Sequence, residues 1–426
     1  MKITVVGLGK IGLPLAVQYA KKSHTVFGAD INEHTVGLVN SAIEPFPGEH
    51  LLREYLTEVS KAGLLTATTD TSEAVTRSEV VVVAVPLFID QDAIPDFRAI
   101  ESATEAIGKG LNSGTLVSFE TTLPVGTTRD RLTPILEKES GLKADEDFFV
   151  VFSPERVFTG RVFADLRKYP KLIGGIGEAS ATKAKEFYEA VLDFDPRNDL
   201  ERPNGVWDLG GAEAAELAKL AETTYRDVNI GLANQFAKYA NKIGVDIYKV
   251  IEACNSQPFS HIHQPGIAVG GHCIPVYPRL YLWNDPEATI VHAAREANAS
   301  MPEHAVELLE RELGPLAEKK IVILGAAYRG GVKEAAFSGV FPLVAALEKR
   351  GAQVKVHDPL YSVKELNLLG LKPFIQGGYT DAAILQADHY EYVTWSEQDL
   401  PGLKVVLDGR GIIDPISWPG VPVRRI

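Results

Sequence analysis

The sequence predicts an α/β protein in which two doubly wound, mostly parallel sheets are joined by a central helical domain with a long helix. Short β-branched runs alternate with helical stretches near both ends of the chain, which is the pattern of parallel strands linked by crossover helices. The middle is a long run rich in Ala, Leu, Glu and Lys. The 426 residues also exceed the roughly 250 to 300 that one hydrophobic core accommodates. We therefore expect three domains, at residues 1–200, 201–312 and 313–426.

The chain is predicted to begin with a strand, a tight turn and a helix. Residues 2–6 form a short apolar run, a glycine-rich turn follows, and residues 13–22 have helical periodicity. Further apolar runs lie at 24–29, 79–85, 115–119 and 148–152. We expect these runs to be strands of one sheet, because each is followed by a polar residue, a proline or a turn. The carboxyl ends of such strands form the ligand-binding edge in doubly wound folds.

The glycine turn has the spacing of a dinucleotide-binding Rossmann motif. Gly7, Gly9 and Gly12 match the G-x-G-x-x-G pattern directly after a strand and before a helix. This pattern lets the backbone turn tightly and approach a pyrophosphate at the helix N-terminus. Asp30 ends the next strand about 20 residues on, where its carboxylate would bind the ribose hydroxyls. No arginine follows at 31–33, so we predict NAD rather than NADP.

The middle and the C-terminal part of the chain have different sequence patterns. Residues 212–242 contain no proline and a single glycine, so we expect a long helix, followed by another at 245–253. The long helix is our candidate for a homodimer interface, and an ordinary buried helix is the alternative. From residue 320 a second strand, turn, helix and strand end in an acid, Asp358, without the three-glycine spacing. We expect this unit to fold like the first without binding a dinucleotide in the same way.

Composition and charge limit the classes of function. The hydrophobic share of 45% and charged share of 23% are those of a globular protein with a core. The net charge of −13 argues against nucleic acid or an anionic membrane as the main partner, since both require clustered positive charge. The start of the chain does not resemble a signal peptide, and no stretch has the length of a membrane span. Two cysteines are too few for a disulfide framework, so we expect a cytoplasmic protein.

Three residues outside the glycine turn are candidates for chemistry. Cys273 lies in a glycine-flanked loop that would expose its thiol, with a small buried cysteine as the equal alternative, which is our interpretation of Cys254. Glu155 follows the strand at 148–152, where an acid can act as a general base, although a solvated or arginine-paired carboxylate is commoner. Lys219, by periodicity alone, is a surface lysine on an amphipathic helix. The histidines near Cys273 lack a metal-ligand spacing, so we predict no metal.

Five segments together resemble the UDP-glucose/GDP-mannose dehydrogenase family in order and spacing. They are GLGKIGLP at 7–14, TLPVGT at 122–127, PERV at 154–157, KLAETTYRDVNI at 219–230 and GGHCIP at 270–275. The resemblance covers nearly the whole chain and includes the family's plan of an NAD-binding domain, a helical centre and a C-terminal nucleotide-sugar-binding domain. PERV and GGHCIP look more like the UDP-N-acetylmannosamine and related N-acetylhexosamine dehydrogenases than the UDP-glucose enzymes.

The resemblance implies a four-electron oxidation of the sugar C6 alcohol to a carboxylate, with two NAD used in succession. It makes Cys273 the nucleophile that traps the aldehyde as a thiohemiacetal, which becomes a thioester and is hydrolysed. Lys219 would stabilise developing oxyanion charge, and Glu155 would act as acid and base. Thr122 would lie beside the nicotinamide and the substrate. The expected product is a uronic acid for surface polysaccharide.

The resemblance also implies two sets of binding residues. NAD is expected to contact Gly7, Gly9, Lys10, Ile11, Gly12, Asp30, Val85, Pro86 and Thr122. The nucleotide-sugar is expected to contact Glu155, Arg156, Val157, Lys219, Thr223, Gly270 and Gly271.

Several positions depart from the family pattern. Thr223 replaces an asparagine, Tyr277 replaces an aspartate, and Phe259 stands near a basic position. The stretch that supplies a substrate-binding arginine reads KEAAFSG at 333–339, with Ala336 in its middle. Three alternatives therefore stay open: a UDP-glucose or GDP-mannose dehydrogenase, a catalytically weak nucleotide-sugar-binding homologue, and a two-electron dehydrogenase acting on another nucleotide-sugar. The presence of Cys273 disfavours the last, because a single oxidation needs no thiol trap.

Overall fold

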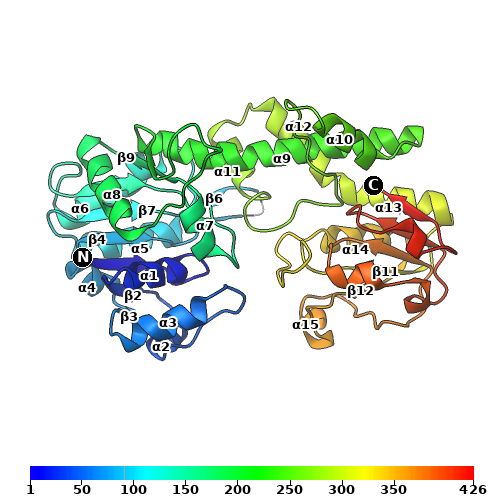
Figure 1. The fold of residues 1–426 in the computed structure, drawn as a ribbon, viewed down its shortest axis with the longest axis horizontal. Helices are drawn as coiled ribbons and strands as arrows, with labels where there is room; N and C mark the ends of the chain where they lie inside the picture. Colours follow the sequence, from blue (N-terminus) through cyan, green and yellow to red (C-terminus); the bar gives the residue numbers. More distant parts are fainter. Residues whose placement is uncertain (91) are drawn as a thin grey trace. The chain divides into compact units, whose positions relative to one another are not determined.

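The computed structural model describes residues 1–90 and 92–426 (Figure 1). These residues divide into two compact units, Met1–Ala221 and Glu222–Ile426. The division falls inside one continuous helix, α9 (Ala212–Ile243), drawn in green in Figure 1. The long helix predicted at 212–242 is thus confirmed and ends one residue later. The three-domain bounds at 1–200, 201–312 and 313–426 stay a prediction.

The described residues of the first unit form an eight-stranded sheet with the order β10-β9-β8-β7-β4-β1-β2-β3. Within it neighbouring strands are parallel except β8 and β9, which are antiparallel. The strands are β1 (Lys2–Val6), β2 (Thr25–Ala29), β3 (Leu65–Thr68), β4 (Val80–Val83), β7 (Leu116–Phe119), β8 (Phe149–Phe152), β9 (Lys171–Gly175) and β10 (Val206–Asp208), with a separate ribbon of β5 (Phe88–Ile89) and β6 (Pro95–Asp96). The strand order reverses between β1 and β4, which creates the crevice where doubly wound folds bind ligands.

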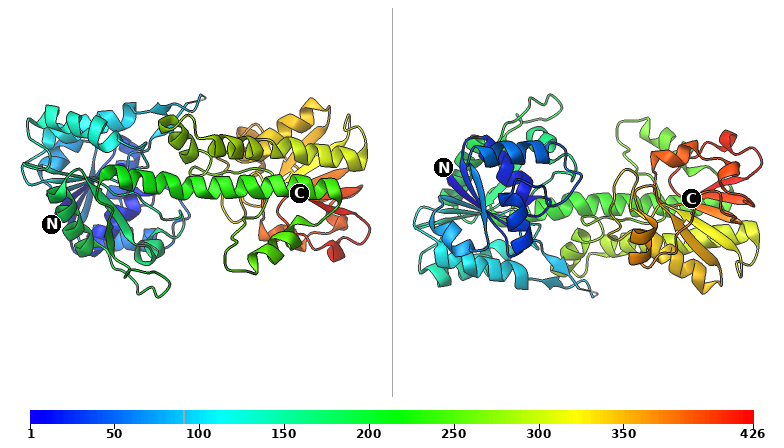
Figure 2. Two further views of the ribbon diagram at one scale, coloured as in Figure 1. Left: turned by 90° about the horizontal axis from the view of Figure 1, so that it is seen from above. Right: turned by 90° about the horizontal axis from the view of Figure 1, so that it is seen from below.

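Helices cover both faces of this sheet (Figure 2). The helices of the first unit are α1 (Gly12–Lys21), α2 (Glu33–Asn40), α3 (Leu52–Lys61), α4 (Thr71–Thr76), α5 (Arg98–Gly110), α6 (Thr133–Ser140), α7 (Val162–Lys168) and α8 (Glu178–Val191). Side chains of α1, α3, α7 and α8 form one apolar core against the sheet, whereas α4, α5 and α6 pack side by side. Because both faces are covered, the functional groups gather at the strand ends.

The central strands are apolar along their whole length because both of their faces are covered. β4 consists of four consecutive valines, all buried, and lies between β1 and β7. Burying each of these side chains stabilises the unit by roughly 1.5 kcal/mol or more. The rigid centre of the sheet thus holds the loops that follow β1, β4 and β7 at one edge.

Residues 222–426, all described, form a second unit around a five-stranded parallel sheet with the order β12-β11-β13-β14-β15. Its strands are β11 (Lys320–Leu324), β12 (Gln353–His357), β13 (Ala382–Leu385), β14 (Val405–Asp408) and β15 (Val423–Arg425). Its helices after α9 are α10 (Ile247–Asn255), α11 (Tyr277–Asn284), α12 (Thr289–Ala299), α13 (Met301–Leu313), α14 (Val340–Lys349) and α15 (Val363–Leu368). One core joins α9, α10, α13 and α14 to the sheet, and an aromatic core around Tyr392, Trp395 and Trp418 lies against other strand residues. The predicted fold class is confirmed.

The acid of the second strand–turn–helix–strand unit is used inside the fold. Oδ2 of Asp358 accepts hydrogen bonds from the backbone N–H groups of Ala326 and Ala327 at 2.8 and 2.9 Å, and lies 3.1 Å from Nε2 of His389. Asp358 is 3% exposed. This carboxylate therefore has the position of the first unit's Asp30 but is engaged by the protein itself.

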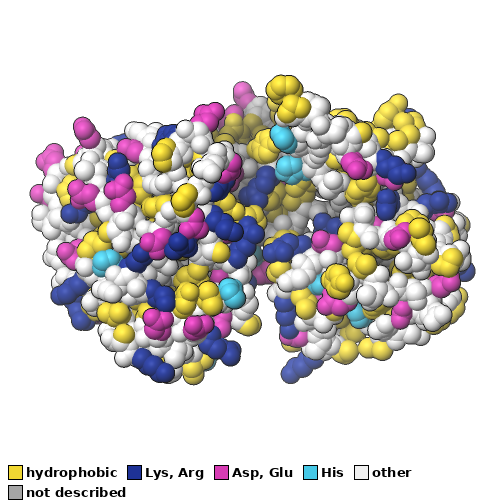
Figure 3. Space-filling model, viewed as in Figure 1, with side chains coloured by type: hydrophobic (Ala, Val, Ile, Leu, Met, Phe, Trp, Pro, Cys, Tyr) yellow, Lys and Arg dark blue, Asp and Glu magenta, His cyan; other side chains and the backbone are white. Residues whose placement is uncertain are grey.

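The surface carries charges of both signs. On the face shown in Figure 3, Lys and Arg side chains are interspersed with Asp and Glu side chains over the first unit. None of the helices in the described part of the chain is long and apolar enough to cross a bilayer.

Candidate active site

The three glycines after β1 have different steric surroundings. Gly7 has a φ of 91°, and a Cβ on it would lie 3.1 Å from the backbone of Ala84. A Cβ on Gly12 would come within 1.8 Å of the Gly7 carbonyl oxygen, so glycine is required where α1 begins. A Cβ on Gly9 would meet no atom of the described residues within 4 Å. The fold therefore requires Gly7 and Gly12, whereas Gly9 leaves the backbone open to a ligand.

Asp30 connects β2 to the glycine turn. Its Oδ2 accepts a hydrogen bond from the N–H of Leu8 at 2.7 Å, and its Oδ1 accepts one from Asn32 at 2.9 Å. Asp30 is half-buried, and an ionised carboxylate has about four acceptor positions, so it can also accept from ribose hydroxyls. Lys10 and Ile11 complete the turn; Lys10 is exposed and Ile11 is half-buried.

The loops after β4 and β7 bring the other predicted cofactor contacts to the same edge. Val85 and Pro86 follow β4, and the Val85 carbonyl accepts a hydrogen bond from Oγ1 of Thr121 at 2.5 Å. Thr122 comes next and is buried. An open backbone at a helix N-terminus, an acid on the next strand and two adjoining strand ends fit a dinucleotide such as NAD.

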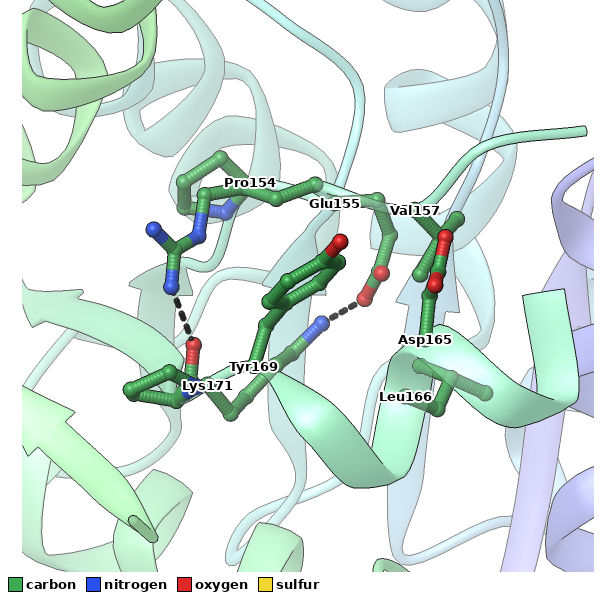
Figure 4. A pocket seen from close by; sticks show the side chains of 9 residues that line it. Pro154, Glu155, Val157, Asp165, Leu166, Tyr169 and Lys171 are labelled. Atoms are coloured by element: carbon green, nitrogen blue, oxygen red, sulfur yellow. Dashed lines mark hydrogen bonds and ion pairs between the residues drawn. The ribbon is translucent and has the colours of Figure 1, made fainter. Parts of the chain in front are cut away.

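Glu155 contacts Lys171 because the sheet changes direction between β8 and β9. Phe152 pairs with Gly174 across the antiparallel strands, so three residues further on Glu155 comes opposite Lys171. Nζ of Lys171 forms an ion pair with Oε1 of Glu155, and the two side chains are 5% and 7% exposed (Figure 4). The antiparallel strand thereby brings its first residue to the carboxyl edge of the parallel strands.

Lys171 also contacts a second carboxylate, that of Glu120, the first residue after β7. Nζ of Lys171 donates to Oε2 of Glu120 at 2.8 Å, and the Glu120 side chain is fully buried. Oε1 of Glu120 accepts hydrogen bonds from the hydroxyls of Tyr188 at 2.6 Å and Tyr19 at 3.4 Å. Burial raises the pKa of both tyrosines well above the usual value, so both donate as neutral hydroxyls. Lys171 is thus held from two sides by carboxylates.

Lys219 belongs to the same cluster. Its Nζ donates to the backbone carbonyl of Glu155 at 2.6 Å, and the residue is 6% exposed. Burial lowers the pKa of Lys171; the Glu120 carboxylate opposes this shift, and the charge of Lys219 adds to it. Lys219 is therefore a buried lysine, unlike the surface lysine that periodicity alone predicts.

Glu216 fixes the start of α9 one helical turn before Lys219. Its Oε2 accepts a hydrogen bond from the N–H of Gly126 at 2.6 Å, and its Oε1 accepts from the N–H and Oγ1 of Thr128 at 2.9 and 2.7 Å. Burial raises the pKa of Glu216 to about 7, although these hydrogen bonds oppose the shift. The carboxylate links the helix that carries Lys219 to the loop that follows Thr122.

Glu155, Arg156 and Val157 line a small cavity. The lining residues are Pro154, Glu155, Arg156, Val157, Asp165, Leu166, Tyr169, Pro170 and Lys171 (Figure 4). Nη2 of Arg156 donates to the Pro170 carbonyl at 2.7 Å. The cavity has a volume of about 10 Å³, near the smallest that holds one water molecule, so it is not by itself a sugar pocket.

Cys273 is exposed and lies in the second unit, in the loop before α11. Its carbonyl accepts a hydrogen bond from the N–H of Tyr277, the first residue of that helix, at 2.9 Å. Of the two alternatives for Cys273, an exposed thiol and a small buried cysteine, the structure has the exposed thiol. Cys254, predicted to be a core residue, is half-buried.

Gly270 and Gly271 hold this loop against the segment that follows β11. A Cβ on Gly270 would lie 2.4 Å from the Cβ of Tyr328, so a larger residue does not fit there. The N–H of Gly271 donates to the Ala336 carbonyl at 2.9 Å, and Gly271 has a φ of 88°. The loop backbone is thus fixed while the Cys273 side chain stays accessible.

The residues that depart from the family pattern lie in the second unit. Thr223 is fully buried on α9, four residues after Lys219, and therefore shares a helix face with it. Phe259 is 91% exposed. Next to Ala336, Phe337 is a non-glycine residue with a φ of 52°. The structure thus brings Glu155 and Lys219 together in the first unit and places Gly270, Gly271 and Cys273 together in the second.

Sequence reasoning missed Lys171, Glu120 and Glu216. Glu120 stands directly after a predicted strand, at the edge where ligands bind, and this position was a usable signal. Lys171 gave a weaker signal, because its role depends on β9 running antiparallel. No group of three or more His, Cys, Asp and Glu side chains in the described residues is arranged to hold a metal ion.

Three family models match the chain in order along its length. They are the NAD binding domain, the central domain and the UDP binding domain of the UDP-glucose/GDP-mannose dehydrogenase family, at residues 1–192, 213–300 and 322–415.

Similar proteins match this chain over nearly its full length and nearly all of their own. The UDP-N-acetyl-D-mannosamine dehydrogenase of Pyrococcus horikoshii is 35% identical over 97% of this chain and 96% of its own. A solved structure of a UDP-D-ManNAc dehydrogenase from that organism has a TM-score of 0.89, with 32% identity over 100% of this chain and 99% of its own. A UDP-glucose dehydrogenase from Pyrobaculum islandicum has a TM-score of 0.86 and 26% identity, covering 99% of this chain and 96% of its own.

Proposed function

This chain belongs to the UDP-glucose/GDP-mannose dehydrogenase family and is an NAD-dependent nucleotide-sugar dehydrogenase, and we propose that it oxidises the C6 alcohol of a UDP-N-acetylhexosamine to the carboxylate. UDP-N-acetylmannosamine is the proposed substrate, because relatives named for it match over nearly the whole chain. The cofactor is NAD. When bound, NAD would supply the hydride acceptor, and the two oxidations would use two NAD in succession.

In the first oxidation Glu155 accepts the proton of the C6 hydroxyl, either directly or through one water. The ammonium of Lys219, 2.6 Å from the Glu155 carbonyl, stabilises the negative charge that develops on the C6 oxygen. Thr122 is buried in the loop that follows β7, the strand next to β4, and in this proposal it contacts the substrate and the cofactor. The product of this step is an aldehyde.

The second oxidation requires the thiol of Cys273. The thiol adds across the aldehyde: the sulfur forms a C–S bond to the carbon and the thiol proton passes to the oxygen, which gives a thiohemiacetal whose hydroxyl resembles the original alcohol. Loss of the second hydride from this carbon, together with release of the hydroxyl proton through Glu155 to solvent, leaves a thioester. Water then attacks the thioester carbon with Glu155 as base, the C–S bond breaks, and the carboxylate and the thiol are released.

The single observation that carries this proposal is the exposed thiol of Cys273 on a loop fixed by Gly270 and Gly271. A thiol trap needs an accessible sulfur, whereas a two-electron dehydrogenase has no use for one. The same exposure disfavours a homologue that only binds nucleotide-sugars.

The test is the amount of NADH formed per mole of sugar consumed. UDP-N-acetylmannosamine, UDP-N-acetylglucosamine, UDP-glucose and GDP-mannose are compared with the wild type, Cys273→Ala and Cys254→Ala. We expect two NADH per sugar from the wild type with UDP-N-acetylmannosamine, and two from Cys254→Ala, which keeps the exposed thiol. Cys273→Ala is expected to yield at most one, because the first oxidation needs no thiol.

The other outcomes of this assay identify the alternatives. Two NADH from UDP-glucose or GDP-mannose alone would change the substrate, and the similarity to a UDP-glucose dehydrogenase keeps that candidate open. One NADH from the wild type would show a two-electron enzyme. No NADH despite NAD binding would support a catalytically weak nucleotide-sugar-binding protein, as suggested by the departures at Thr223, Tyr277 and Ala336.

We also propose that the protein is a cytoplasmic homodimer that supplies a uronic acid for polysaccharide synthesis. Both cysteines are free thiols, in keeping with a reducing compartment. Five exposed apolar side chains in the part of α9 that belongs to the second unit recur at intervals of seven, four, three and four residues, which places them on one helix face; they are Tyr225, Leu232, Phe236, Tyr239 and Ile243. This apolar stripe fits a second copy of the same helix.

A further inference from the structure

The catalytic scheme uses Glu155 but assigns nothing to Lys171, the buried ammonium that contacts it. Lys171 is 5% exposed and lies between the Glu155 and Glu120 carboxylates. A buried lysine is costly unless it is paired, and the two carboxylates supply that pairing.

The groups around Lys171 come from four other parts of the first unit. Glu120 follows β7, Glu155 follows β8, Tyr188 lies on α8 with its ring centroid 4.7 Å from Nζ, and Lys219 lies on α9. Tyr19 on α1 donates to the far side of Glu120. Arg156, Asp165 and Tyr169 line the small cavity beside Glu155 and Lys171, and Asp165 is paired with Arg161. Lys171 contacts both carboxylates, whereas Lys219 contacts the backbone carbonyl of Glu155.

Glu120 and Glu155, the two carboxylates that contact Lys171, differ in burial and in their other partners. The side chain of Glu120 is fully buried and accepts from Tyr188 and Tyr19, so it has no exposed side-chain surface from which to reach a substrate. Glu155 follows β8 at the ligand-binding edge and keeps 7% of its side chain exposed. Glu120 therefore anchors the ammonium, and the ammonium orients Glu155.

We infer that Lys171, anchored by Glu120, is a positioning residue that holds the Glu155 carboxylate ionised and in one orientation for its role as acid and base. This inference rests on the proposed function, in which Glu155 moves the protons. An ammonium in contact with a carboxylate favours its charged form by about 1 to 3 pKa units, so without Lys171 a proton would bind Glu155 at higher pH.

The role of the Lys171 charge is tested in the full-length protein by three variants, which remove the charge, remove it together with the charge of Glu120, or keep it on an arginine. Lys171→Met removes the ammonium and keeps a similar length, but it also leaves the Glu120 carboxylate without its cationic partner. The double variant Lys171→Met/Glu120→Gln removes that second effect, because a neutral amide can still accept from Tyr188. Lys171→Arg keeps the charge. Lys185→Met makes the same substitution at an exposed lysine of α8 and is the control.

We expect the double variant to melt close to the wild type and yet to have a kcat about 10- to 100-fold lower, with a smaller change in KM. The acid limb of its kcat/KM profile is expected to move up by about 1 to 3 pH units, because Glu155 must be ionised to accept a proton. Lys171→Arg should restore most of the rate, and Lys185→Met should match the wild type. If the double variant recovers the wild-type kcat and pH profile, Lys171 only neutralises Glu120 and the inference is wrong.

A titration without substrate separates this inference from the proposed function. Carbon-13 NMR of protein labelled at the glutamate carboxyl carbons, with Glu155→Gln to assign the signal, reports the ionisation of Glu155 directly. We expect its midpoint to rise in Lys171→Met/Glu120→Gln; an unchanged midpoint overturns the inference. If the wild type produces no NADH from any of the four nucleotide-sugars, the proposed function fails, and this titration still decides the role of Lys171.

Discussion

Gly9 and Gly12, only three residues apart, are under different constraints. Gly12 faces the Gly7 carbonyl oxygen, whereas Gly9 faces open space. The sequence spacing predicts a glycine at both positions. The structure shows that packing requires the glycine at 12, whereas the glycine at 9 leaves space for a ligand.

We expect Gly9→Ala to weaken NAD binding while leaving stability almost unchanged. The added methyl group occupies the space where the pyrophosphate approaches, and the Kd for NAD should rise about tenfold or more, which corresponds to about 1.4 kcal/mol. Gly12→Ala should instead lower the free energy of unfolding by about 3 kcal/mol, because the methyl group overlaps the backbone of Gly7. Calorimetric NAD titration and thermal melts of both variants check this. Equal loss of stability in the two variants would contradict it.

The residues at the site differ in how far sequence reasoning could reach them. The spacing of Gly7, Gly9 and Gly12 is a local pattern, and the structure confirms the strand, turn and helix around it. The burial of Lys219 is not local, because it depends on α9 docking against the loop that holds Glu155. Helical periodicity describes one helix and carries no information about the loop it meets.

At the scale of elements, the direction of β9 determines the composition of the acid–base cluster. Apolar runs predict that a strand exists and approximately where it ends, but not whether it is parallel to its neighbour. Had β9 been parallel to β8, Lys171 would lie at the opposite edge of the sheet from Glu155. The pairing of Phe152 with Gly174 therefore supplies information that the sequence pattern lacks.

Glu216, at the start of α9, is predicted to make the stability of the fold depend on pH. The pKa of Glu216 is about 7 in the folded protein and near 4.5 when unfolded, so the folded state binds this proton more tightly. Stability from this group is present below about pH 4.5 and is lost as pH rises through about 7, by on the order of 3 kcal/mol at most.

Glu216→Gln removes this titration and tests it. The amide of the variant places N–H groups near the N–H of Gly126, so the variant should be less stable than the wild type overall. The informative quantity is the slope of the unfolding free energy against pH. We expect the difference in unfolding free energy between wild type and variant to shrink between pH 5 and 8, measured by denaturant unfolding. A constant difference would contradict the shifted pKa.

At the scale of the whole molecule, the apolar stripe on α9 predicts a homodimer. Phe236 lies at the centre of the stripe, so Phe236→Glu would bury a charge against an apolar partner and should break the association. Light scattering after size exclusion is expected to give twice the 46.3 kDa chain mass for the wild type and one chain mass for the variant.

The matched control is Gln235→Glu, which adds the same charge at the neighbouring exposed residue, outside the stripe. It should leave the mass at two chains. A wild type that elutes as a single chain at all concentrations would remove the dimer from the proposal.

The two sheets also show what an attempt to engineer a second cofactor site would face. Introducing the three-glycine spacing after β11 would reproduce the turn of the first unit, but the acid that follows β12 would not be available to a ribose. Asp358 already accepts from Ala326, Ala327 and Leu360 and contacts His389, whereas Asp30 reaches the surface. The two similar strand–turn–helix–strand units thus differ in the accessibility of a single carboxylate, and redesign would have to release Asp358 before adding glycines.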